Sequence, residues 1–173
     1  MNAARSGPVT AGEGSTLDEV EVQRFLDEAR ECAMQMLQNA AYIQTELDNV
    51  QMSDALRVRT RQICDDLIGT RYDITHEIFE VDDLLTSKAP SREIVARADR
   101  IVRWLGDDVE KMHGVVMALE AAADQERACG LAYILVSESA VNILKPFYRA
   151  QDGAEGLRKQ TDESRDAEQA VAA

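Results

Sequence analysis

Apolar side chains recur every three or four residues along most of this chain, and the pattern starts afresh four times. This spacing places one stripe of side chains on one face of an α-helix, and no segment shows the alternation of a half-buried strand. Four such stripes are hidden from water only if they pack together. The sequence therefore predicts an all-α protein, an antiparallel up-down four-helix bundle with long helices, coiled-coil-like packing and disordered termini.

The predicted bundle covers residues 15–150, with helices at about 16–50, 53–87, 91–123 and 127–149. Thr16, Ser53 and Ser91 are the expected N-caps, because an N-cap oxygen accepts a hydrogen bond from an unpaired backbone N–H in the first turn. Pro90 separates the second helix from the third.

The fourth helix is the least regular. Its best apolar face is rotated by roughly 100° from the preceding stripe, which favours a turn at residues 124–127. Pro146 lacks a backbone N–H and is expected to bend or end this helix. The face expected to point inward consists of Cys129, Tyr133, Val136, Ala140, Ile143 and Phe147.

Two terminal segments offer little apolar surface to a core. Residues 1–14 contain three glycines and a proline, and residues 151–173 are polar around a single leucine, Leu157. Such segments do not offset the entropy lost on ordering. We expect a disordered N-terminal segment and, at 151–173, a polar solvated tail or a frayed helix.

Charges support antiparallel hairpins. Acids gather at the end of the second predicted helix and arginines at the start of the third, and each sign is unfavourable for its own helix dipole. The acids are Glu77, Glu80, Asp82 and Asp83, and the arginines are Arg92, Arg97, Arg100 and Arg103. The first hairpin repeats this inversion with Glu46 and Asp48 against Arg57, Arg59 and Arg61.

The 173-residue chain is acidic, with a formal net charge of -13. This charge argues against nucleic acid and against an anionic membrane, because both bind through Lys and Arg. The longest apolar run, residues 128–136, is far shorter than the roughly 20 residues of a membrane span. The three cysteines lack the spacing of a zinc site or a disulfide framework. We expect a cytoplasmic protein, and the excess of Arg over Lys favours a bacterial source.

Both histidines follow a carboxylate by three residues, in the pairs Asp73/His76 and Glu110/His113. Di-iron carboxylate bundles use this unit, with every ligand pointing inward. Here the two pairs lie at different heights in the predicted bundle, and most of their side chains face away from the stripes, so a solvated surface is the preferred interpretation. The alternative is a metal-binding bundle, an oxidase or a metal store, with ligands Glu110, His113 and Glu138. No cofactor is expected.

A second apolar stripe runs along the second predicted helix through Ile68, Tyr72 and Phe79, about 140° from the main stripe. Trp104 also lies off its own main stripe. Aromatic side chains outside a core often mark a partner site. The stripe is therefore interpreted either as a partner-binding surface or as a second contact within the bundle.

Ser137 and Ser139 flank Glu138, but no His or Lys is placed to activate either hydroxyl, so the sequence gives hydrolase chemistry no support and favours a non-enzyme. The preferred function is non-catalytic binding of a protein partner, either a second copy in a homodimer or another protein in an adaptor or regulatory role. A small acidic chaperone or secretion-associated protein is a further alternative.

Overall fold

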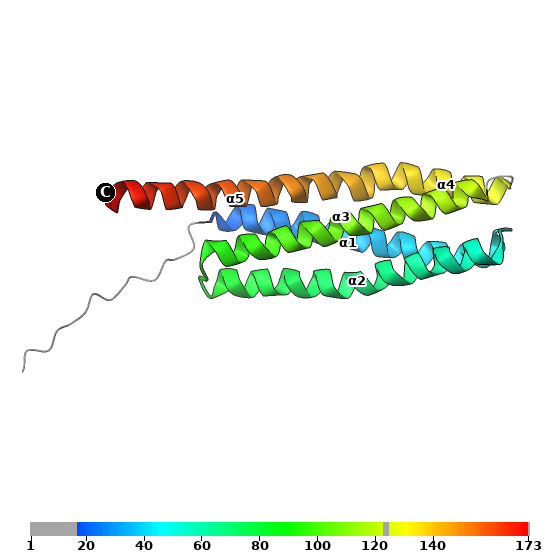
Figure 1. The fold of residues 1–173 in the computed structure, drawn as a ribbon, viewed down its shortest axis with the longest axis horizontal. Coiled ribbons are helices and arrows are strands. Elements are labelled where there is room, and N and C mark those ends of the chain that lie inside the picture. The colour runs from blue at the N-terminus through cyan, green and yellow to red at the C-terminus, as the bar shows by residue number, and fades with distance from the viewer. Residues whose placement is uncertain (1–16, 123–124, 173) are drawn as a thin grey trace, which may run out of the picture.

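The computed structural model describes residues 17–122 and 125–172 (Figure 1). The segment 1–14 and the expected cap Thr16 lie outside this part of the chain. The elements are α1 (Glu19–Glu46), a short 3-10 turn (Leu47–Asn49), α2 (Asp54–Thr86), α3 (Ser91–Ala121), α4 (Glu126–Glu138), the π-helical turn η2 (Ser139–Ile143) and α5 (Leu144–Ala172). The described residues form helices and turns without a strand, which confirms the all-α prediction.

Four helical rods make the bundle, because α4, η2 and α5 join into one. α1 packs against α2 and α5, and α3 packs against α2 and against α4 and α5. The rods therefore follow chain order around the bundle, and α2 and α5 lie on opposite sides of it, as Figure 1 shows. The predicted antiparallel four-helix bundle is confirmed.

One hydrophobic core runs along the bundle axis. Each rod contributes large buried side chains, among them Phe25, Leu67, Ile101 and Leu135. Phe25, Leu67 and Ile101 lie at spacings of three and four from other apolar side chains of their helices and so belong to the stripes predicted from sequence, whereas Leu135 lies outside the face predicted for the fourth helix. Burying a side chain of this size contributes about 1.5 to 3 kcal/mol, so the stripes account for the association of the rods.

Helix caps match the sequence expectation at one of the two described positions. The Ser53 hydroxyl accepts a hydrogen bond from the Leu56 N–H at 3.3 Å, as predicted. Ser91 is the first residue of α3 rather than its cap, because the extended backbone of Pro90 (ψ 135°) already leads the chain into the helix. The cap of α1 is Asp18, whose carboxylate accepts from Val20 N–H at 2.9 Å.

The predicted charge pairing holds the α2–α3 hairpin. Glu77 accepts from Arg97 at 2.9 Å and from Arg100 at 2.8 Å, and Arg97 also lies 3.1 Å from Glu80. In the first hairpin Asp48 pairs with Arg61 at 2.8 Å, also as predicted. These pairs link consecutive antiparallel helices and favour this register over others.

One charge of the first hairpin pairs with a different rod. Glu46, expected to face the arginines of α2, contacts Arg127 of α4 at 2.8 Å instead. This ion pair ties the start of the fourth rod to the end of α1.

The fourth rod continues far beyond its predicted end. α5 extends to Ala172 and buries Ala150, Ala154 and Leu157 against the bundle, so the helix does not end at Pro146 and the bundle boundary at residue 150 is wrong. A proline ring crowds the carbonyl four residues earlier, here that of Asn142. That carbonyl belongs to the wider π-helical turn, which places the proline where the α-helical ladder is already interrupted.

The face of α4 that turns inward is not the predicted one. Its buried side chains are Ala128, Leu131, Ala132 and Leu135. Of the predicted face, Ile143 is buried and Phe147 is half-buried, whereas Cys129, Tyr133, Val136 and Ala140 are exposed. Tyr133 and Val136 thus point to solvent, while Ala128 and Ala132 on the opposite side are small enough to let this rod approach the bundle closely.

Candidate functional site

The side chains considered as metal ligands do not gather. Glu110 and His113 are exposed on α3, and Glu138 is half-buried at the end of α4. His76 is exposed and lies 3.8 Å from Glu80. Within residues 17–122 and 125–172, no three His, Cys, Asp or Glu side chains are placed to hold a metal ion. The geometry gives the metal-site alternative no support.

Asp108 is a buried acid that the sequence analysis missed, although its spacing from Ile101 and Leu105 places it on the inward face of α3. Only 2% of the residue is exposed. Its carboxylate accepts from Lys111 Nζ at 3.0 Å, and this ammonium also donates to Thr70 of α2 at 3.3 Å. Burial raises the pKa of Asp108 more than the Lys111 hydrogen bond and charge lower it. The cluster links α2 to α3 within the bundle.

Two of the three cysteines are poor nucleophiles. Burial raises the pKa of both Cys32 and Cys64 to about 12, with nearby carboxylates adding to the shift. The Cys32 thiol donates to the carbonyl oxygen of Ile143 at 3.5 Å. Cys129 is exposed on α4. The thiolate is the reactive form, so the two buried thiols serve as small core side chains.

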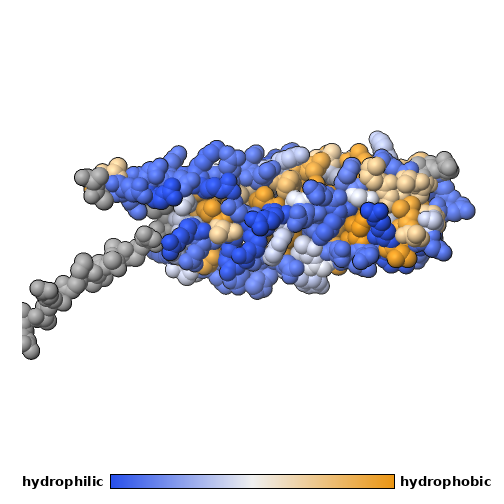
Figure 2. Space-filling view, in the orientation of Figure 1, coloured by the Kyte–Doolittle hydropathy of each residue, from blue (hydrophilic) through white to orange (hydrophobic). Residues whose placement is uncertain are grey.

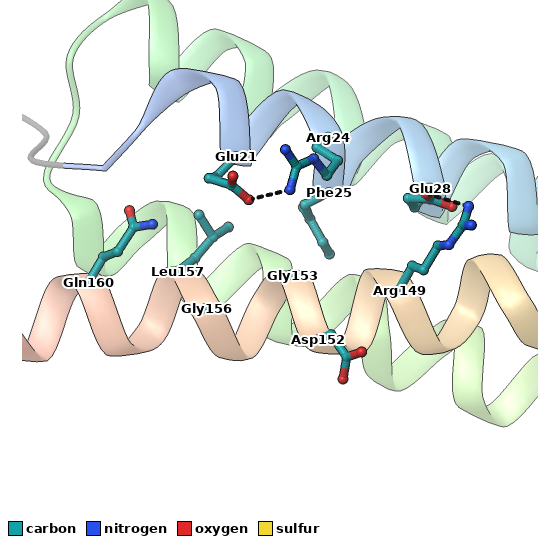
Figure 3. A pocket seen from close by; sticks show the side chains of 10 residues that line it. All are labelled: Glu21, Arg24, Phe25, Glu28, Arg149, Asp152, Gly153, Gly156, Leu157 and Gln160. Atoms are coloured by element: carbon teal, nitrogen blue, oxygen red, sulfur yellow. Dashed lines mark hydrogen bonds and ion pairs between the residues drawn. The ribbon is translucent and has the colours of Figure 1, made fainter.

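A groove of about 460 Å³ lies between α1 and α5 (Figure 3). Phe25 points across it toward Gly153, where a Cβ atom would stand 3.3 Å from the Phe25 Cβ. Its charged rim is already paired, since Arg149 reaches Glu28 at 3.1 Å. We interpret the groove as a consequence of close helix packing at Gly153.

The partner site predicted on α2 divides into two parts. Tyr72 and Phe79 are 72% and 62% exposed, whereas Ile68 and Trp104 are partly buried against the core. The two exposed rings, seven residues apart, define what we call the α2 face. Acidic side chains surround it, and those that are exposed are Asp65, Asp66, Asp73 and Asp83.

A larger apolar surface lies on the fourth rod. It consists of Cys129, Tyr133, Val136, Val141 and Tyr148, and we call it the α4–α5 face. Tyr133, Val141 and Tyr148 are 74%, 61% and 56% exposed. Successive members are four, three, five and seven residues apart, and the five-residue step crosses the π-helical turn. The wider turn therefore keeps these side chains on one side of the rod.

Hydrophobic surface gathers over α4 and the adjoining end of α3, while most of the remaining surface in view is hydrophilic (Figure 2). Met117 of α3 and Ile134 of α4 are also exposed. Between residues 128 and 148 the chain carries only two charges, Glu138 and Lys145. This rod is thus apolar on both its inner and its outer side.

The same rod has the length and composition of a membrane span. Over an 18-residue window within Glu126–Val171 the mean hydropathy is 1.2, and 28% of that window is buried in the bundle. We predicted no membrane span because the longest uninterrupted apolar run is too short. The 18-residue window differs because it can include two charged residues. Core helices of soluble proteins have the same property, so hydropathy alone does not distinguish a protein from a lipid environment.

Comparisons with protein-family models, curated proteins and solved structures find no match to this chain.

Proposed function

We propose that this protein is a non-catalytic helical bundle that acts by binding another protein, in an adaptor or regulatory role. The supporting observation is the exposure of Tyr72 and Phe79 on a helix whose opposite side is already buried in the core. Aromatic side chains gain much contact area at little entropic cost when a partner covers them. The expected setting is the bacterial cytoplasm, without nucleic acid, membrane or cofactor.

The chemistry of the α2 face suggests what the partner carries. Tyr72 and Phe79 lie two turns apart, roughly 10 Å along the helix axis. A partner helix with two apolar pockets or side chains at this spacing would cover both. The surrounding aspartates favour Lys or Arg at its rim and oppose the pairing of two α2 faces with each other. The proposed partner at this face is therefore a different protein with a basic rim.

Site-specific photocrosslinking in the source cell tests the proposal. A photoreactive phenylalanine analogue placed at Tyr72 or Phe79 should capture the same protein. The matched control is Gln62, an exposed polar position on the same helix. Capture of one partner from both aromatic positions and not from Gln62 supports the proposal, and equal or absent capture at all three positions contradicts it.

A pair of variants links the captured partner to the two rings. Tyr72→Asp combined with Phe79→Asp should leave the helical circular dichroism spectrum unchanged, because both side chains are exposed, and should weaken partner binding at least about tenfold. Val58→Asp, at another exposed apolar position of α2, serves as the control. A chaperone would instead bind many unfolded clients and would discriminate little between these variants.

A further inference from the structure

The α4–α5 face requires a binding partner different from the one proposed for the α2 face. It lies on the opposite side of the bundle from the α2 face, so one partner helix does not cover both. Tyrosines stand near its two ends and aliphatic side chains lie between them. An apolar stripe of this kind, about 28 Å long at 1.5 Å per residue, is typical of a helix that packs against another helix.

We infer that a second copy of this chain covers the α4–α5 face. The two fourth rods pair antiparallel about a two-fold axis that passes near Val141. This inference concerns a different surface from the proposed function and does not depend on it.

The arrangement of residues around Val141 makes the face self-complementary. Tyr133 and Tyr148 lie eight and seven residues on either side of it, so each tyrosine meets the other across the axis. A two-fold axis makes this contact twice. Two tyrosine pairs result from one register.

Net charge also selects this face for self-association. The whole chain carries -13, whereas residues 128–148 carry one acid and one base and are neutral. Two copies approaching here avoid the repulsion that acidic surfaces produce elsewhere, including at the α2 face. The same excess of negative charge disfavours an anionic lipid surface.

The surface is large enough to contribute to a stable dimer. Given their exposure, the four tyrosines of two copies would bury roughly 400 to 700 Å². Standard stable interfaces bury about 1,200 to 2,000 Å² in total. The aliphatic side chains between the tyrosines supply further area in the same strip.

Mass measurement in solution by light scattering is the first test. The wild-type chain should be a dimer, and Tyr133→Asp or Tyr148→Asp should be a monomer with unchanged helical circular dichroism. Tyr72→Asp, equally exposed but on α2, should remain dimeric. A wild-type chain that stays monomeric at its highest soluble concentration overturns the inference, as does a dimer that survives both tyrosine substitutions or is lost in Tyr72→Asp.

Crosslinking tests the axis itself. In a Cys129→Ser background, Val141→Cys should form a disulfide-linked dimer on mild air oxidation, because this residue is its own neighbour across the axis. Tyr72→Cys in the same background is the control and should not crosslink. If the wild-type chain is instead monomeric and binds phosphatidylcholine vesicles through Tyr133 and Tyr148, the occupant is lipid and the inference is wrong.

Discussion

Leu135 and Ile143 are eight residues apart, yet both are buried in the same core. In a regular α-helix, side chains seven residues apart share a face, and an eighth residue turns the side chain about 100° further. The π-helical turn absorbs the additional residue, since the Leu144 N–H bonds to the carbonyl of Ser139, five residues earlier. This turn connects two segments whose apolar stripes would otherwise be misaligned.

Changes in chain length at this turn should have unequal effects. In a Pro146→Ala background, deleting Ala140 converts the π-helical turn to an α-helical one and keeps Leu135 and Ile143 on the core side. We expect a change in unfolding free energy of about 1 kcal/mol or less. Inserting an alanine after Val141 rotates Ile143 and Leu157 out of the core and should cost roughly 3 to 6 kcal/mol.

Thermal and urea unfolding, followed by circular dichroism, measure both changes against the Pro146→Ala parent. Equal destabilisation by the deletion and the insertion would show that the turn does not set the alignment of α5.

Glu77 should make the bundle sensitive to acid. Burial by itself raises the pKa of the Glu77 carboxyl, but the hydrogen bonds and charges of Arg100 and Arg97 outweigh burial and hold it below its usual value. A lowered pKa stabilises the folded state above the unfolded carboxyl pKa of about 4.3, and this stabilisation is lost as the pH falls through the folded pKa.

Glu77→Gln should therefore be about 1 to 3 kcal/mol less stable than wild type at pH 7. The difference should shrink as the pH falls below about 4.3. Urea unfolding between pH 7 and pH 3 measures it, and a difference that is independent of pH would show that the carboxylate charge is not what stabilises the hairpin.

Asp108 should change the stability of the fold with pH in the direction opposite to Glu77. Its raised pKa means that the folded state binds the proton more tightly than the unfolded state, so its ionised form destabilises the fold at neutral pH. Asp108→Asn keeps the shape and an acceptor for Lys111, and should be no less stable than wild type at pH 7. The unfolding free energy of wild type should rise relative to that of Asp108→Asn as the pH falls. A difference between the two that does not change with pH would contradict this assignment.

Two glycines of α5 allow a matched test of helix packing. A Cβ at Gly156 meets nothing within 4 Å, whereas one at Gly153 stands 3.3 Å from Phe25. Gly156→Ala should gain about 1 kcal/mol from helix propensity. Gly153→Ala should gain less or lose stability, because α1 and α5 must move apart slightly. Equal gains in urea unfolding would mean that the close approach at Phe25 is readily relaxed.

The first three rods could be predicted from sequence because each has one continuous apolar stripe that is clearly the stronger of its faces. The fourth could not, because α4 is apolar all round and periodicity gives two candidate faces. The predicted face contained Tyr133 and Val136, whereas the buried face contains Leu131 and Leu135 together with two alanines. The π-helical turn leaves no mark in a pattern that assumes 3.6 residues per turn throughout.

The candidate surfaces were predictable to different degrees. The off-stripe positions of Tyr72 and Phe79 indicated their exposure, while the similar positions of Ile68 and Trp104 did not reveal that neighbouring rods partly cover them. The α4–α5 face was missed because three of its members, Cys129, Tyr133 and Val136, had been assigned to the core. Identifying this face requires knowing that Ala128 and Ala132 point into the bundle, and only the packed structure shows this.

The π-helical turn also bears on how this chain avoids misassembly. In a bundle of uniform heptads, one helix can shift along the axis by a whole repeat, because the shifted alignment still buries its apolar stripe. Among the described residues the eight-residue step occurs once, next to the Cys32–Ile143 hydrogen bond, so a shifted fourth rod would bring its π-helical turn against regular α-helical segments of its neighbours. The π-helical turn thus restricts the fourth rod to one axial position.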